Sequence, residues 1–73
     1  MTSAPAHDWK DKDGNPLGCR EKIKVLDGNM REITQLCRDA LDDALLMGCS
    51  QAAFKETLHA MIREIEPTVK ERS

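Results

Sequence analysis

The sequence predicts an all-α protein, a two-helix antiparallel hairpin with a long helix over about 19–48 and a short helix over about 51–66. Apolar residues in the long segment recur at steps of three and four, the heptad spacing of a helix that packs against other helices. The chain has one Trp, one Phe and no Tyr, and a core of Leu, Ile, Met and Ala suits helices better than sheets. The heptad positions are Ile23, Leu26, Met30, Ile33, Cys37, Ala40, Ala44 and Met47.

Length and charge limit the classes of function. Seventy-three residues make one small domain, near the size at which a monomeric core is marginal. The net charge is −2 with both signs interspersed, so nothing attracts the chain as a whole to nucleic acid or to an anionic membrane. The sequence has no apolar run of membrane-spanning length and no export signal at its start. We therefore expect a cytoplasmic protein with reduced cysteines and no nucleic-acid or membrane partner.

The first 18 residues are expected to form a flexible tail that contains a turn. Small and polar residues dominate its beginning, and the segment Asp13-Gly14-Asn15-Pro16 is a strong turn signal. Trp9 is an isolated aromatic residue in this polar segment. We expect it to dock on the surface of a helix, because its indole gains free energy only where it is covered.

The triplet Asp-Gly-Asn at 27–29 leaves the start of the long helix open to two interpretations. All three residues are poor helix formers, and the triplet ends in an Asn that fits a capping box. The alternative is a hairpin with strands around 9–12 and 22–26, followed by two helices. We favour a continuous helix because the apolar residues before the triplet stay in register with those after it. A single helical Gly costs only about 1 kcal/mol relative to Ala.

The hairpin turn and the second helix have clear boundary signals. Gly48 is a candidate for the left-handed residue that ends the long helix, and Ser50 is a candidate N-cap for the next one. Pro67 disfavours helical geometry at the residue before it, so the short helix should end at Glu66. Residues 67–73 are expected to form a polar tail. The inner positions of the short helix are Phe54, Leu58, Met61 and Ile65.

The difference in helix length predicts a homodimer. At 1.5 Å per residue the long helix would span about 45 Å and the short one about 24 Å, so the start of the long helix would lie bare. Residues 20–31 carry four basic and two acidic side chains, a net +2, whereas residues 32–49 carry one basic and four acidic, a net −3. An antiparallel pair of long helices would set these halves against each other. We therefore expect a homodimeric four-helix bundle with interface residues Ile23, Leu26, Met30, Ile33, Leu36, Leu41 and Leu45.

The cysteines are the polar side chains most able to carry chemistry. Cys37 lies on the heptad positions and is best explained as a small core residue. Cys19 and Cys49 lie at opposite ends of the long helix, too far apart to pair within one chain. In an overlapped antiparallel dimer they would approach each other across chains. They are therefore the candidate redox residues.

The sequence offers no convincing catalytic, cofactor or metal site. Glu56 and His59 have the spacing of di-iron bundles, yet with the inner positions facing a core Glu56 points outward and His59 lies on the flank. The acidic run at 38–43 lacks the glycine-rich loop and basic residues of a phosphate site, and we interpret it as solvated surface or a docking face for a basic protein. No cofactor is expected.

These observations predict a small, non-enzymatic protein–protein interaction or regulatory module that acts as a helical homodimer. One alternative is a thiol- or metal-based sensor that uses Cys19 and Cys49, with His59 as a further ligand. Another is an accessory subunit of a larger enzyme, with Leu36, Leu41 and Leu45 as the docking face. In length and topology the predicted hairpin resembles small bacterial regulatory phosphatases with a Ser-Gln-x-Leu-Asp motif. Here Ser50-Gln51 is not followed by Leu-Asp, so no catalytic residue is carried over.

Overall fold

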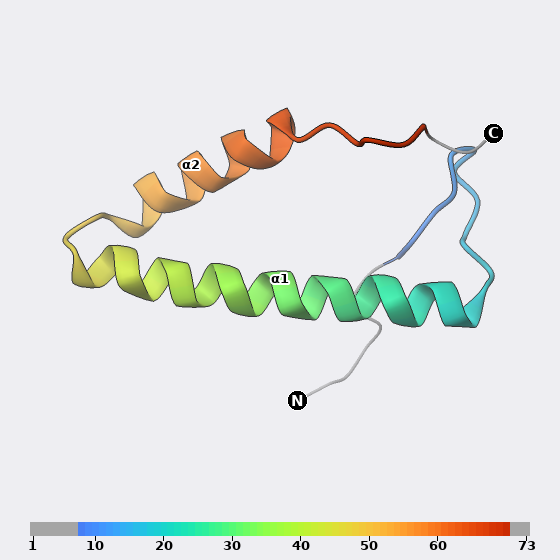
Figure 1. Cartoon of the computed structure of the whole chain (residues 1–73), viewed down its shortest axis with the longest axis horizontal. Coiled ribbons are helices and arrows are strands. Elements are labelled where there is room, and N and C mark those ends of the chain that lie inside the picture. The colour runs from blue at the N-terminus through green and yellow to red at the C-terminus, as the bar shows by residue number, and fades with distance from the viewer. Residues whose placement is uncertain (1–7, 71–73) are drawn as a thin grey trace. The chain divides into compact units, whose positions relative to one another are not determined.

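The computed structural model describes residues 8–70, and within them the protein is all-α. It contains two helices, α1 (Arg20–Leu46) and α2 (Gln51–Glu64) (Figure 1). Residues 8–70 contain no strand, and their β-type pairing is limited to an isolated antiparallel bridge between Lys10 and Pro16. The predicted fold class of two helices is therefore confirmed.

Helix α1 runs without interruption through the triplet at 27–29. It has 27 residues, which corresponds to a length of about 40 Å. Gly28 keeps helical geometry, and a Cβ built on it would have Arg31 Nη2 at 3.7 Å as its nearest neighbour. The continuous helix is thus confirmed, and the alternative strand at 22–26 is wrong. Helical register of the apolar positions outweighs the low propensity of three residues.

The turn between the helices is built from the two residues that the sequence singled out. Gly48 has a φ of 95°, and its amide donates to the carbonyl of Leu45 at 3.1 Å. The amide of Cys49 donates to the carbonyl of Ala44 at 2.8 Å, which completes a Schellman motif. Ser50 then caps α2, because its hydroxyl accepts from the amide of Ala53 at 3.0 Å. Both predicted boundary residues are confirmed.

Helix α2 ends two residues before the predicted end at Glu66. Its last helical residue is Glu64, and Ile65 is the C-cap with extended backbone angles. The amide of Ile65 donates to the carbonyl of Ile62 at 3.2 Å, a tightened last turn. Pro67 has no amide hydrogen for a helical bond back to residue 63, so the segment just before it lacks a bond that would hold it helical.

The described chain divides into two units within α1, residues 8–33 and residues 34–70. The first unit holds a loop and the first half of α1. The second holds the rest of α1, the turn and α2. No side chain among residues 8–70 is buried in either unit. Each unit therefore has half-buried contacts in place of a core.

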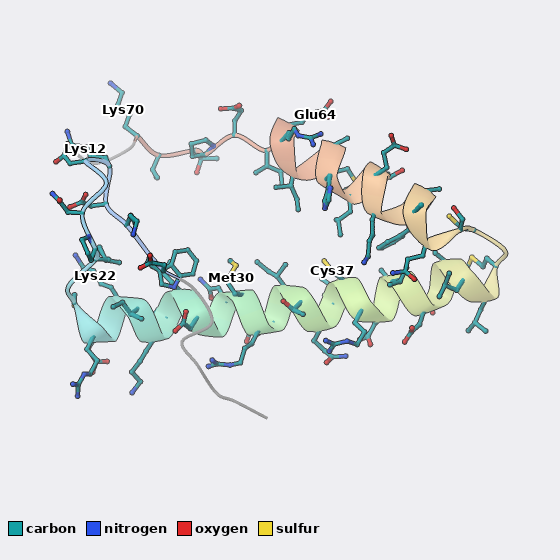
Figure 2. All side chains as sticks on the ribbon, turned by 180° about the vertical axis from the view of Figure 1, so that it is seen from behind. Lys12, Lys22, Met30, Cys37, Glu64 and Lys70 are labelled. Atoms are coloured by element: carbon teal, nitrogen blue, oxygen red, sulfur yellow. The ribbon has the colours of Figure 1, made fainter. Side chains whose placement is uncertain are left out.

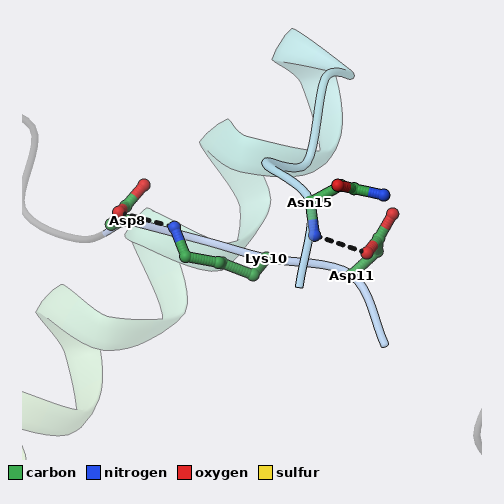
Figure 3. Close-up of polar contacts among 4 residues, drawn as sticks. All are labelled: Asp8, Lys10, Asp11 and Asn15. Carbon is green, nitrogen blue, oxygen red and sulfur yellow. Dashed lines mark hydrogen bonds and ion pairs between the residues drawn. The ribbon is translucent and has the colours of Figure 1, made fainter. Parts of the chain in front are cut away.

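The loop of the first unit has more local structure than the predicted flexible tail. The amide of Leu17 donates to the carbonyl of Trp9 at 2.9 Å, and the amide of Asp11 donates to the carbonyl of Asn15 at 2.8 Å. The carboxylate of Asp11 accepts from the amide of Asp13 at 2.9 Å. It also accepts from the amide of Asn15 at 3.0 Å (Figure 3). The turn spans residues 11–14, where the amide of Gly14 donates to the carbonyl of Asp11 at 3.0 Å, and so begins two residues before the predicted 13–16. Residues 1–7 of the predicted tail lie outside the described residues.

Candidate interaction surfaces

Trp9 docks on α1, as its isolated position in the sequence predicted. Its indole Nε1–H donates to Oδ1 of Asp27 at 2.7 Å, and both residues are half-buried. The Trp9–Leu17 backbone bond fixes the loop that carries the indole. Asp27, which the sequence marks as a weak helix residue, thus provides the acceptor that holds the loop to the helix. The pair is separated by 18 positions, and no local pattern could have revealed it.

A shallow apolar hollow lies on the first unit, between the end of the loop and the first turns of α1. Its volume is about 410 Å³, and its lining consists of Leu17, Val25, Leu26 and the side chains of Glu21 and Lys22. Val25 is 62% exposed. The sequence pattern identified Leu26 but missed Leu17 and Val25, which lie off the heptad positions.

The second unit contains the helix–helix contact of the hairpin. Cys37 and Leu41 of α1 and Phe54 and Leu58 of α2 are all half-buried and line a common groove of about 280 Å³. Three predicted inner positions, Cys37, Phe54 and Leu58, therefore meet over the first two turns of α2. Leu41, which was predicted at the dimer interface, joins them in this contact. The second half of α2 does not continue the contact, since Met61 and Ile62 are 57% and 54% exposed.

Large apolar side chains are exposed on both helices. Leu36 is 70% exposed and Leu46 is 87% exposed, values typical of polar surface residues. Scattered exposed hydrophobic residues are ordinary on a monomer. Here they coincide with the absence of any buried side chain among residues 8–70. The full set is Val25, Ile33, Leu36, Leu45, Leu46, Met47, Met61, Ile62, Ile65 and Val69.

The apolar positions of α1 separate into a covered row and an uncovered row. Figure 2 shows Met30 and Cys37 pointing to the same side of the helix, and both are half-buried. Ile33, Leu36 and Met47 are instead 49%, 70% and 84% exposed. These three exposed residues belong to a heptad line with alternating steps of four and three, which we call the open seam. Leu26 is half-buried in this line, and its other members are exposed. The open seam consists of Lys22, Leu26, Asn29, Ile33, Leu36, Ala40, Asp43 and Met47.

The predicted interface residues fall on different parts of α1. Ile33 and Leu36 lie on the open seam and are exposed. Leu45 is 46% exposed but lies off the seam by its helical position. The remaining predicted interface residues are half-buried, namely Ile23, Leu26, Met30 and Leu41. The exposed members of the predicted set are therefore Ile33, Leu36 and Leu45, of which only Ile33 and Leu36 lie on the open seam.

The candidate redox residues Cys19 and Cys49 are free thiols at the protein surface. Cys19 immediately precedes α1, and Cys49 follows its last residue after Met47 and Gly48, so the two thiols lie beyond opposite ends of the helix. The Sγ of Cys49 lies 3.4 Å from the carbonyl oxygen of Ser50. Cys37 is half-buried in the groove of the second unit, in agreement with its interpretation as a packing residue.

Within residues 8–70 the structure brings together no group of three or more His, Cys, Asp or Glu side chains that could hold a metal ion. Glu56 and His59 are both exposed on α2. The Asp11 carboxylate already accepts two backbone amides. Neither helix is long and apolar enough to cross a membrane, judged over the same residues.

Comparison with known proteins finds no relationship. No protein-family model matches the chain, and neither the curated proteins nor the solved structures give a match.

Proposed function

We propose that this protein is a non-enzymatic protein–protein interaction or regulatory module that acts as a helical homodimer in the cytoplasm. The observation that carries the proposal is the absence of a buried side chain among residues 8–70, together with a line of exposed apolar residues on α1. A folded domain of this size needs more apolar burial than half-covered residues provide. A partner supplies that burial.

The partner that best fits is a second copy, which would complete a four-helix bundle. Covering a Leu or Ile side chain stabilises a complex by about 1.5–3 kcal/mol. In a symmetric dimer each such residue is covered in both copies, so its contribution counts twice. The first half of α1 is net basic and the second half net acidic, so the same chain carries both members of a complementary pair. The three free cysteines suit a reducing compartment.

The homodimer is tested by analytical ultracentrifugation over a range of micromolar concentrations. We expect a concentration-dependent dimer of the wild-type chain under reducing conditions. Leu36→Gln should raise the dissociation constant by about tenfold to a hundredfold, because two leucines leave the interface. Leu46→Gln is the matched control. It is the same substitution at an even more exposed leucine of α1 that lies off the open seam, so it should leave the dissociation constant unchanged.

A wild-type monomer at every concentration would contradict the homodimer, in which case the exposed leucines would serve the accessory-subunit function that also fits this surface. An equal effect of the two leucine variants would leave the homodimer standing and show that the open seam is not the contact. Circular dichroism of each variant verifies that α1 is still helical.

A further inference from the structure

We infer that the second copy packs antiparallel along the open seam, in a register that places Ile33 opposite the partner's Leu36. This inference rests on the proposed function and specifies its interface. The two residues are the central exposed apolar members of the seam, at 49% and 70% exposure. Because α1 is a single helix through both positions, heptad spacing sets which other residues oppose each other once this central pair is placed.

The remaining seam positions pair without a gap in that register. Asn29 falls opposite the partner's Ala40, where the small side chain leaves room for the amide. Leu26 falls opposite the partner's Asp43, and Lys22 falls opposite the partner's Met47. Every one of the eight seam residues therefore meets another seam residue. A seam with alternating steps of four and three maps onto itself in this way when it is reversed about its midpoint.

Charge determines the direction of pairing. Lys22 lies at one end of the open seam and Asp43 near the other, and both are exposed. In the antiparallel register the ammonium of Lys22 lies about one helical turn from the partner's Asp43, within reach of a lysine side chain. A parallel pair would instead place Lys22 against the partner's Lys22, and Asp43 against the partner's Asp43. Antiparallel helices also set the net basic half of α1 against the net acidic half of its partner.

The same register brings Cys19 next to the partner's Cys49. Cys19 immediately precedes α1, and Cys49 is the last residue of the Schellman motif that ends it. Both thiols are exposed and free. Along the sequence, Cys19 and Cys49 lie at the same distance from the midpoint between residues 34 and 35 to within one residue. In the antiparallel dimer, Cys19 of each chain therefore lies level with the partner's Cys49, once at each end. The native cysteines therefore report both the direction and the register of the helices.

The experiment is disulfide mapping of the intact chain with oxidised glutathione as the oxidant. Two cysteine thiols lose two electrons and two protons, and one glutathione disulfide becomes two glutathione thiols. The reduced chain is first shown to be dimeric by ultracentrifugation, then oxidised under native conditions, alkylated and analysed on non-reducing gels. Peptide mass spectrometry identifies the linked cysteines. The samples are wild type, Cys19→Ser, Cys49→Ser, and an equimolar mixture of the two variants.

We expect a Cys19–Cys49 link between chains in the wild type, a loss of most of the covalent dimer in each variant alone, and its return in the mixture. The mixture is diagnostic because each variant supplies the thiol that the other lacks. Covalent dimer in the single variants, through Cys19–Cys19 or Cys49–Cys49 links, would show a parallel pair and overturn the inference. A reduced dimer that gives no link between chains would overturn the register while the proposed function stands. A reduced monomer would instead contradict the proposed function.

Discussion

The indole of Trp9 donates a hydrogen bond to the carboxylate of Asp27 at 2.7 Å, and this bond holds the N-terminal loop against α1. The acceptor is charged, and such bonds are stronger than those between neutral groups. The contact lies one turn before Arg31 and next to Gly28, in the part of α1 with the weakest helix propensity. A tertiary bond therefore supports α1 where the sequence supports it least.

Removing the acceptor should release the indole. In Asp27→Ala the fluorescence emission of Trp9, the single tryptophan of the chain, should shift to longer wavelength, and acrylamide should quench it more strongly. The reason is that the loop loses a bond worth about 1 kcal/mol or more. Asp27→Asn is the matched control, since its amide oxygen still accepts from the indole. Fluorescence is a better readout than stability here, because Ala also raises helix propensity. Unchanged emission in Asp27→Ala would contradict the contact.

Two glycines of the chain should respond in opposite ways to the same substitution. Gly28→Ala should stabilise α1 by about 1 kcal/mol, because Gly28 is helical and a Cβ there meets only the end of a flexible arginine at 3.7 Å. Gly48→Ala should destabilise the turn by about 1 kcal/mol or more, because its φ of 95° disfavours a side chain even in open space. Urea unfolding followed by circular dichroism measures both. A stabilising Gly48→Ala would contradict the Schellman turn.

The N-cap of α2 should contribute measurably to the stability of this helix, because none of its residues is buried. Ser50→Ala removes the acceptor for the amide of Ala53 and should lower the free energy of unfolding by about 1 kcal/mol. Ser50→Asp preserves an acceptor and adds a charge that favours the helix N-terminus, so it should keep or raise stability. Thermal unfolding by circular dichroism compares the three proteins. Equal stability of the Ala and Asp variants would be the contrary result.

A charge exchange tests the direction of the helices by a route independent of the cysteines. Lys22→Glu should weaken an antiparallel dimer by about threefold to tenfold, since two partly exposed ion pairs are lost. Adding Asp43→Lys should restore the dissociation constant toward that of the wild type. Lys24→Glu is the control, an equal charge change on α1 away from the open seam. In a parallel dimer Lys22→Glu would replace one like-charged pair with another, and the dissociation constant would hardly change.

Helix boundaries were predictable from the sequence because they depend on local chemistry. Gly48 and Ser50 mark the turn through a left-handed backbone and a capping hydroxyl, and both are properties of single residues. The end of α2 was predicted less well, because Pro67 shows that the helix must end before it but does not determine which residue is the last helical one. The error of two residues there reflects a missing hydrogen bond, which acts on the whole last turn.

The surfaces were only partly predictable. Heptad spacing found a broad apolar face on α1 but did not distinguish Cys37, which the hairpin half-covers, from Ile33 and Leu36, which remain exposed. That division depends on what packs against each unit, and local spacing carries no such information. For the same reason the Trp9–Asp27 bond and the part of Leu17 in the hollow of the first unit could not be read from the sequence.

Because no side chain among residues 8–70 is buried, the folded fraction of this protein should depend on its concentration. A chain that completes its burial by association gains stability by mass action, so its folded fraction rises with its own concentration. Under the proposed function, dilution would unfold the protein as well as separate its subunits. Expression level would then act as a regulator in its own right: below a threshold the cell would hold unfolded chains exposed to proteases, and above it a working module.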